Sequence, residues 1–418
     1  MAVRIEVAKR LRGAYRAASK AEKSAVLDDF CQVTGLGRST ARRYLTDPGV
    51  GEASVVKLDR RCHRPTKYSA ESKRLLVRLW RLEGMPCGKY MAANLPEWIS
   101  ALERHGELVI DQEHFTERTR CEVLAMSAAT IDRYLKEERQ RLELRGIGAT
   151  KRGALLRNSI QIRTATQEVE AEPGFFEIDT VAHCGPTLKG EFARTLSMTD
   201  VHTGWIHLEV CRNNAQTHIL AALNRAAQAI PFMIQGIDCD NGSEFINHDV
   251  LEWAADLDIF FTRSRPYQKN DQANIESKNN HVVRRYGFHY RYDTEEQRQL
   301  LAALWQVVCL KMNFFTPTRK PIGWRQEATG KRKRIYDSPQ TPYQRLLAAG
   351  TLSASQKRQL ARIYKKTNPA ELTREILRYQ DLLMSIAREP TEALTAKVYD
   401  QQQRRKQRLQ NGITIRTA

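Results

Sequence analysis

The sequence predicts a multidomain protein with all-helical modules at the N-terminus, a central α/β domain with a mixed sheet, and a small basic module followed by helices at the C-terminus. Three observations support this prediction. The chain has 418 residues, too many for one average domain. Its first third contains one helical pattern twice. Its middle third alternates strand-like and helical segments in a fixed order.

The charge of the chain indicates a partner that is rich in phosphate. There are 67 Lys and Arg residues against 48 Asp and Glu residues, which gives a formal net charge of +19. Such an excess is typical of proteins that bind nucleic acid. We expect no membrane partner, because no apolar run approaches the roughly 20 residues that a bilayer requires, and no secretory signal is expected at the N-terminus. Eight scattered cysteines fit a reducing cytoplasm better than a zinc site or a disulfide scaffold.

The N-terminal third contains a repeated helix-turn-helix pattern. The segments STARRYL (residues 39–45) and ATIDRYL (residues 129–135) share Thr, Arg, Tyr and Leu at the same four places. Each segment follows an apolar helix and a short turn, so the Tyr and Leu are expected to face inward. In such a unit the N-terminal residues of the second helix meet DNA. The predicted DNA contacts are Arg38, Ser39, Arg42 and Arg43 in the first copy, and Ser127, Ala129, Thr130 and Arg133 in the second.

A plain helical hairpin with a solvated basic face is the alternative for each copy. This alternative is stronger for the second copy, because Asp132 dilutes its positive charge. We expect helix-turn-helix modules at residues 1–50 and 51–144. Residues 145–172 have a basic, glycine-bearing sequence without a sustained period, which predicts a linker that lies along phosphates.

The middle third predicts an α/β domain over residues 173–300. Strand-like and helical runs follow one another in the order βββαβαβ, and a last helix comes after a polar loop. The expected strands are residues 175–181, 193–201, 204–212, 232–240 and 260–265, and the expected helices are residues 215–230, 248–259 and 275–288.

Three carboxylates stand at element ends in this domain. Asp179 lies in the first strand, Asp240 ends the fourth strand, and Glu276 begins the last helix. An unpaired carboxylate at the end of a buried strand costs several kcal/mol, and a bound cation removes that cost. Asp238 is a rival of Asp240, because strand alternation points both side chains to the same face. Each acid alone is also explained as an ordinary residue at a strand end or a helix start.

These features together resemble a known catalytic core. The order of elements, an aspartate on the first strand, a second aspartate in DNGSEF, and a glutamate after thirty-five intervening residues are similar to the D,D-35-E core of bacterial insertion-sequence transposases and retroviral integrases. The resemblance covers residues 174–285. It implies an RNase H-like fold (βββαβαβα) in which Asp179, Asp240 and Glu276 are catalytic and bind two Mg²⁺ or Mn²⁺ ions. The spacing favours Asp240 over Asp238.

Residues around the last helix are expected to contact DNA. Asn280 and Arg284 lie one and two helical turns after Glu276, on the same face, and the preceding loop contains Lys269. A solvated surface position is the alternative for Arg284. His183 follows Asp179 closely, and we expect it to be structural.

The resemblance implies a DNA transposase of an insertion sequence. Such an enzyme binds the terminal inverted repeats, cleaves the 3′ ends of the element and joins them to target DNA. It implies self-association on DNA, at least as a dimer, and leaves open the need for an ATPase helper. The chain lacks the His-His-Cys-Cys zinc module of retroviral integrases, so the bacterial branch is the closer likeness. Alternatives are a DNA-binding regulator that has lost the chemistry, and a nuclease.

The C-terminal third is expected to be auxiliary. Residues 301–350 predict a basic extended module that lies across phosphates. Residues 351–390 predict two helices, the first with a capping box of Ser353 and Gln356 and the second with Asn368 as N-cap. Residues 391–418 predict a disordered cationic tail.

Overall fold

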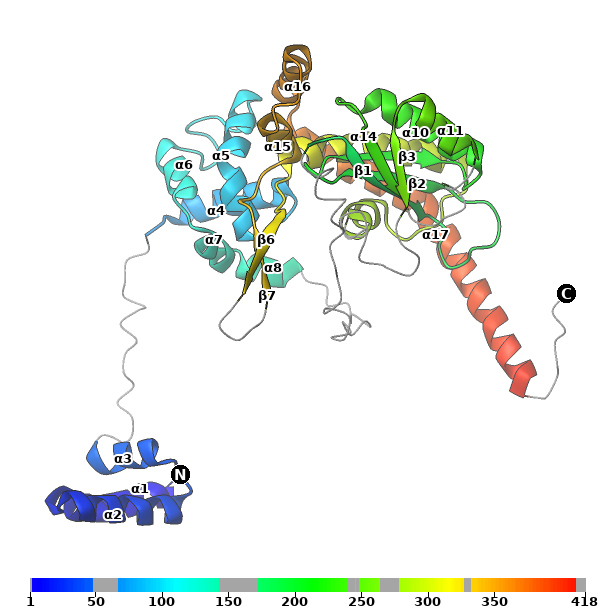
Figure 1. The fold of residues 1–418 in the computed structure, drawn as a ribbon. Helices are drawn as coiled ribbons and strands as arrows, with labels where there is room; N and C mark the ends of the chain where they lie inside the picture. The colour runs from blue at the N-terminus through cyan, green and yellow to red at the C-terminus, as the bar shows by residue number, and fades with distance from the viewer. Residues whose placement is uncertain are drawn as a thin grey trace. The chain divides into compact units, whose positions relative to one another are not determined.

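The computed structural model describes residues 2–47, 67–142, 172–239, 245, 248–263, 278–326 and 332–410. They divide into two compact units, Met1–Lys67 and Tyr68–Ala418. Figure 1 shows the elements of both units.

The first unit is a bundle of three helices. Its elements are α1 (Ala2–Ala17), α2 (Lys20–Thr34) and α3 (Arg38–Thr46). Ser19 caps α2 and forms a capping box with Glu22, and Gly35 ends α2 in the left-handed conformation at φ 67°. The small core consists of Ala8, Tyr15, Leu27, Phe30, Ala41 and Leu45. The two helices predicted for the first copy are therefore present as α2 and α3.

The second unit begins with five helices. They are α4 (Ala70–Glu83), α5 (Gly88–Arg104), α6 (Glu117–Leu124), α7 (Ala128–Tyr134) and α8 (Lys136–Leu142). Trp80 of α4 and Trp98 of α5 are completely buried. The second predicted pair of helices is present as α6 and α7, and Ser127 caps α7 by accepting a hydrogen bond from the Thr130 amide.

A five-stranded mixed sheet forms the centre of the second unit. Its strands are β1 (Phe175–Ala182), β2 (Arg194–Asp200), β3 (Ile206–Cys211), β4 (Gly236–Cys239) and β5 (Phe260–Arg263), in the order β3-β2-β1-β4-β5. β1, β2 and β3 are antiparallel neighbours, whereas β4 and β5 continue the sheet in parallel with β1. This topology confirms the predicted RNase H-like domain.

Helices accompany the sheet in the predicted order. They are α10 (Gln216–Ala229), α11 (His248–Asp256), the π-helix η2 (Asn279–Arg284), α13 (Arg285–Gly287) and α14 (Glu295–Phe315). Both α10 and α14 pack against β3. The predicted boundary at residue 300 is wrong, because α14 runs through it. Its buried Leu301, Leu304 and Trp305 keep this part of the chain in the core.

The C-terminal region contains a β-hairpin and three helices. They are β6 (Pro321–Gln326), β7 (Arg332–Tyr336), α15 (Pro342–Ala348), α16 (Ala354–Lys366) and α17 (Pro369–Gln410). The capping box of Ser353 and Gln356 is present at α16, and Asn368 accepts a hydrogen bond from the Ala370 amide at the start of α17.

The expectation of a disordered tail from residue 391 is wrong as far as Gln410, because α17 continues to that residue. Leu383, Ala387 and Thr391 are buried and hold the helix against the rest of the unit, largely against α14. The residues that follow are rich in Gln, Lys and Arg, which are good helix formers. In Figure 1 the last turns of α17, in red, extend past the elements that cover its first turns.

Buried polar contacts join the helical region to the rest of the second unit. Asn94 and Trp98 of α5 donate hydrogen bonds to the Phe315 carbonyl at the end of α14, at 2.8 and 3.0 Å. The Thr373 hydroxyl of α17 donates to the Leu82 carbonyl of α4 at 2.7 Å. The apolar core is continuous across these contacts. No described helix is both long enough and apolar enough to span a lipid bilayer.

Candidate active site

Asp179 lies on β1 and is held from two sides. Its Oδ1 accepts a hydrogen bond from the Thr180 amide at 2.7 Å, and its Oδ2 accepts one from the side-chain amide of Asn279 at 2.6 Å. Asn279 is the first residue of η2. The hydrogen bond therefore joins the central strand of the sheet to the helical segment that follows Glu276 in the sequence.

Two further carboxylates lie on the same face of the sheet. Side chains alternate along a strand, so Glu177 and Asp179 share one face of β1. Glu177 is the direct partner of Asp238 on β4. Glu177 is 5% exposed and Asp238 is 8% exposed, and Asp238 accepts a hydrogen bond from the Thr262 hydroxyl at 2.7 Å. Asp238 thus contributes to the contact between β4 and β5.

The remaining predicted ligands cannot be compared with this geometry. Asp240 and Glu276 lie outside the described residues, as does Lys269. Within the described part of the chain, no group of three or more His, Cys, Asp or Glu side chains is arranged to hold a metal ion. The chemistry of Asp179 nevertheless fits a hard cation, because it is a carboxylate whose orientation is fixed by neighbouring donors.

The η2 helix carries Asn280 and Arg284, which are predicted to contact DNA, and its first residue, Asn279, contacts Asp179. Val282 and Val283 are buried and anchor η2 in the core. Asn280 is exposed, whereas Arg284 is partly buried, and burial lowers the pKa of its guanidinium. π-helical turns are frequent at functional sites. Asn280 was predicted from the sequence and Asn279 was not, although a residue three positions after Glu276 also falls on the same helix face.

His183 is a structural residue, as expected. It is completely buried, and its Nε2 lies 2.8 Å from the Thr195 hydroxyl. Trp305 donates a hydrogen bond to the same hydroxyl at 3.0 Å. Burial, together with the nearby positive charges of Arg284 and His289, lowers the pKa of His183 to about 3. The imidazole is therefore neutral at physiological pH and packs between Tyr292 and Trp305.

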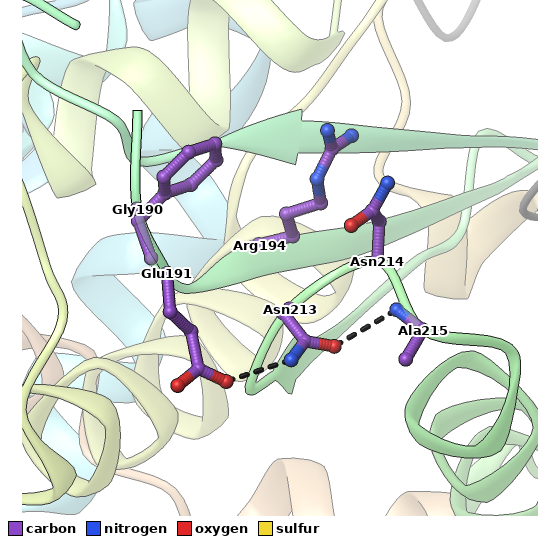
Figure 2. Close-up of a pocket in the computed structure, with 7 residues that line it drawn as sticks. Gly190, Glu191, Arg194, Asn213, Asn214 and Ala215 are labelled. Carbon is purple, nitrogen blue, oxygen red and sulfur yellow. Dashed lines mark hydrogen bonds between the residues drawn. The ribbon is translucent and has the colours of Figure 1, made fainter. Parts of the chain in front are cut away.

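A shallow polar pocket lies at the start of β2 and the end of β3 (Figure 2). Arg194 donates a hydrogen bond to the Thr180 hydroxyl at 3.0 Å, next to Asp179 in the sequence. Because Arg194 pairs with Ala182, its side chain lies on the sheet face opposite to that of Asp179. Figure 2 shows Asn213 bridging Glu191 and the Ala215 amide. The pocket is thus separate from the carboxylate face.

The predicted DNA contacts of the first unit lie at the exposed start of α3. Arg38 donates a hydrogen bond to the Ser24 hydroxyl at 2.6 Å and forms an ion pair with Asp28. Ser39, Arg42 and Arg43 are exposed. The exposed face of α3 therefore carries two arginines beside a hydroxyl.

The predicted contacts of the second copy are partly used within the fold. The Ser127 side chain caps α7 and lies 3.0 Å from the Thr130 hydroxyl. The Arg133 guanidinium stacks 5.6 Å from the ring centroid of Tyr134, and Ala129 is exposed. Of the four predicted contacts, Ser127 and Thr130 therefore take part in the cap of α7, whereas Ala129 and Arg133 are exposed.

Comparison with known proteins adds three similarities. Residues 170–269 match the model of the integrase core domain. The chain is 36% identical over 323 residues to an uncharacterized protein, y4rM, of Sinorhizobium fredii (strain NBRC 101917 / NGR234), which covers 77% of this chain and 88% of that protein. It is also similar to the crystal structure of the catalytic core domain of BIV integrase, with 15% identity and a TM-score of 0.30 over 42% of this chain and 95% of that one.

Proposed function

The chain belongs to the DDE transposase/integrase superfamily, and from this premise we propose that it is the transposase of an insertion sequence. Its integrase core domain is of the transposase and integrase type, a class of polynucleotidyl transferases that act on DNA. The proposed reaction is hydrolysis at the 3′ ends of the element, followed by attack of each freed 3′-hydroxyl on target DNA.

The hydrogen bond between Asn279 and Asp179 is the observation that carries this proposal. It brings β1 against the segment that directly follows Glu276. The parallel register of β1 and β4 pairs Glu177 with Asp238 and Ile178 with Cys239. Asp240 directly follows Cys239 in the sequence, as Asp179 directly follows Ile178, and we propose that these two carboxylates belong to one site with Glu276. All three predicted ligands would then converge.

Asp179, Asp240 and Glu276 would together hold two Mg²⁺ or Mn²⁺ ions, for which carboxylate oxygens are suitable ligands. Such a pair of ions supplies activation of the attacking oxygen and stabilisation of the leaving oxygen. Asn279 and the Thr180 amide fix the orientation of the Asp179 carboxylate. Asp238 is proposed to be structural because it is buried and bonded to Thr262.

End recognition is proposed to come from the helix-turn-helix units. Arg42 and Arg43 on α3 would contact DNA in the terminal inverted repeats, and Arg133 on α7 would add a weaker contact. Asn280, Arg284 and Lys269 would hold DNA close to the carboxylates. The joining of two element ends would require at least a dimer on DNA. The assay described next contains no ATPase helper, because it measures cleavage and joining directly.

A strand-transfer assay tests this proposal. A labelled duplex that carries the flanking terminal sequence is incubated with the protein, Mg²⁺ and a target plasmid. Joined product is expected, and Asp179→Asn or Glu276→Gln should abolish it while leaving duplex binding largely intact. Asp249→Asn, at an exposed position of α11, is the matched control and should retain activity.

The other outcomes identify the alternatives. Nicking without joined product favours a nuclease. Binding without either reaction favours a regulator that has lost the chemistry, and retention of full activity by Asp179→Asn contradicts the proposed site.

A further inference from the structure

The hairpin of β6 and β7, here named the β6–β7 ribbon, stands apart from the core sheet. It is a separate two-stranded sheet in which Arg325 pairs directly with Lys333. Ile322 is 65% exposed and Ile335 is 42% exposed. An isolated two-stranded hairpin is at best marginally stable in water. The ribbon therefore needs support from its base or from a partner.

The base of the ribbon is firmly anchored to the second unit. Arg345 of α15 is 7% exposed and forms an ion pair with Asp337 at 3.0 Å, directly after β7. The same guanidinium donates to the carbonyls of Thr318 at 2.6 Å and Thr203 at 3.3 Å. The Lys320 amide donates to Asp337 at 2.6 Å. A buried ion pair thus holds both strands at one end and ties them to the turn between β2 and β3.

Arg319 strengthens the same end of the ribbon. Its guanidinium donates to the Asp337 carbonyl at 2.8 Å and lies 5.0 Å from the ring centroid of Tyr336. The anchoring contacts thus gather at the base, whereas the described side chains farther along the strands, including Arg325 and Lys333, are exposed. This arrangement presents the strands to solvent from a rigid support.

The charge of the ribbon identifies the kind of partner that it fits. Residues 321–336 contain a single acid, Glu327, and five basic residues, which are Arg325, Lys331, Arg332, Lys333 and Arg334. Like charges directly opposite each other in a strand pair are destabilising, and Arg325 faces Lys333 across the ladder. A polyanion offsets that cost. The major groove of duplex DNA is wide enough to admit a two-stranded β-ribbon.

We propose that the β6–β7 ribbon is a DNA-binding arm that enters the major groove of a duplex, with Arg325 and Lys333 on the phosphates that flank the groove. The assignment of that duplex to element or target DNA rests on the proposed transposase function. The binding itself depends only on the anchored base, the exposed strands and their charge. It is therefore testable apart from catalysis.

The test measures duplex binding of the full chain by fluorescence anisotropy over a series of salt concentrations. The double variant Arg325→Ala/Lys333→Ala should weaken binding and reduce the slope of log K against log salt by about 2, because each lost phosphate contact lowers it by about 1. The matched control, Lys357→Ala/Arg358→Ala on the exposed face of α16, removes the same charge and should reduce the slope less.

A charge-preserving variant separates contact from folding. Arg325→Lys/Lys333→Arg should bind nearly as the wild type does, with an unchanged melting curve. The proposal is overturned if the alanine variant keeps the wild-type slope, or if it loses only self-association in light scattering, which would assign the ribbon to a second copy of the chain. If the proposed function alone is wrong, strand transfer is absent, but the substitutions in the ribbon still reduce the salt slope.

Discussion

The two helix pairs, α2 with α3 and α6 with α7, share a sequence pattern but differ in their contacts with the rest of the protein. Leu45 of α3 and Leu135, the C-cap of α7, occupy the same place in the pattern, and both are completely buried. Among the positions that differ, one reverses the sign of the charge. Arg42 is exposed on α3, whereas the corresponding Asp132 of α7 accepts a hydrogen bond from the Gly88 amide at 2.7 Å and pairs with Arg139 at 2.8 Å.

The difference extends to the surroundings of each unit. A Cβ atom at Gly88 would lie 2.3 Å from the Ala128 carbonyl, so α5 and α7 approach more closely than any other residue at position 88 allows. The first helix pair, α2 with α3, instead belongs to the separate compact unit Met1–Lys67. The same sequence pattern thus occurs in one helix pair that exposes its cations and in one that is built into the larger unit, Tyr68–Ala418. We infer that the first unit contributes more to DNA recognition.

The largest expected effect comes from shortening the matched leucines. Leu45→Ala and Leu135→Ala should each cost about 2–5 kcal/mol of the stability of their own unit. Leu135→Ala should also impair strand transfer, because α7 shares a core with the sheet, whereas Leu45→Ala should mainly reduce end-specific binding. Thermal unfolding and strand-transfer assays on both variants check this. Equal loss of catalysis in the two would remove the distinction.

The arginines should show a smaller difference, in binding. Arg42→Ala should weaken binding to the terminal sequence by about 1–3 kcal/mol if it contacts a base edge, whereas Arg133→Ala should have less effect. Anisotropy titrations with specific and scrambled duplexes measure both. A larger loss for Arg133→Ala would reverse the assignment of roles.

Acid should destabilise the two units differently. The pKa of His183 in the folded chain is lowered to about 3 from a usual value of 6.5. Below pH 6.5 the unfolded chain therefore takes up a proton that the folded chain does not, so the contribution of His183 to stability falls by about 1.4 kcal/mol per pH unit as the pH falls. Residues 2–47 contain no histidine, so the bundle of α1, α2 and α3 lacks this contribution.

Urea unfolding between pH 7.5 and pH 5 tests that difference. His183→Gln should remove this contribution from the pH dependence of the second unit's stability, even though the substitution lowers the stability overall. An unchanged slope in this variant would mean that His183 titrates normally in the folded protein.

The smallest effect is expected at Asp132, the position where the first helix pair has Arg42 instead. Asp132→Asn should cost about 1 kcal/mol, because the Gly88 amide keeps an acceptor while the charge is lost beside a partly exposed Arg139. The comparison variant, Arg42→Gln, should leave the melting temperature of the first unit unchanged. Calorimetry of the two variants measures the contrast, and a stable Asp132→Asn protein would show that this carboxylate contributes little to the fold.

Local signals in the sequence were enough to predict the order of the strands along the chain and several helix starts. Alternation over short runs predicted β1 to β5, and side chains within three residues predicted the cap of α16. From the sequence, Asp132 was interpreted only as a residue that reduces the positive charge of its segment. Its hydrogen-bond partner Gly88 was not predicted, because Gly88 lies 44 residues away along the chain. Sequence periodicity does not contain contacts of that kind.

The site illustrates the same limit. Asp179 was predicted from its strand and its resemblance to a known core, but its partner Asn279 was not, because positions three and four after Glu276 both fit one helix face. The segment adopts π-helical winding, which an ideal period does not anticipate. The end of α17 was missed because its polar sequence has no apolar stripe to predict a helix.

Iron-directed cleavage tests most directly whether Asp179, Asp240 and Glu276 hold metal ions together. Fe²⁺ is added in place of Mg²⁺ to the DNA-bound protein with ascorbate and peroxide, and the cut positions in the polypeptide are mapped. Cuts are expected near all three residues, with suppression by excess Mg²⁺ and loss in Asp179→Asn. Cuts confined to other parts of the chain, or unchanged cuts in Asp179→Asn, would contradict a shared metal site.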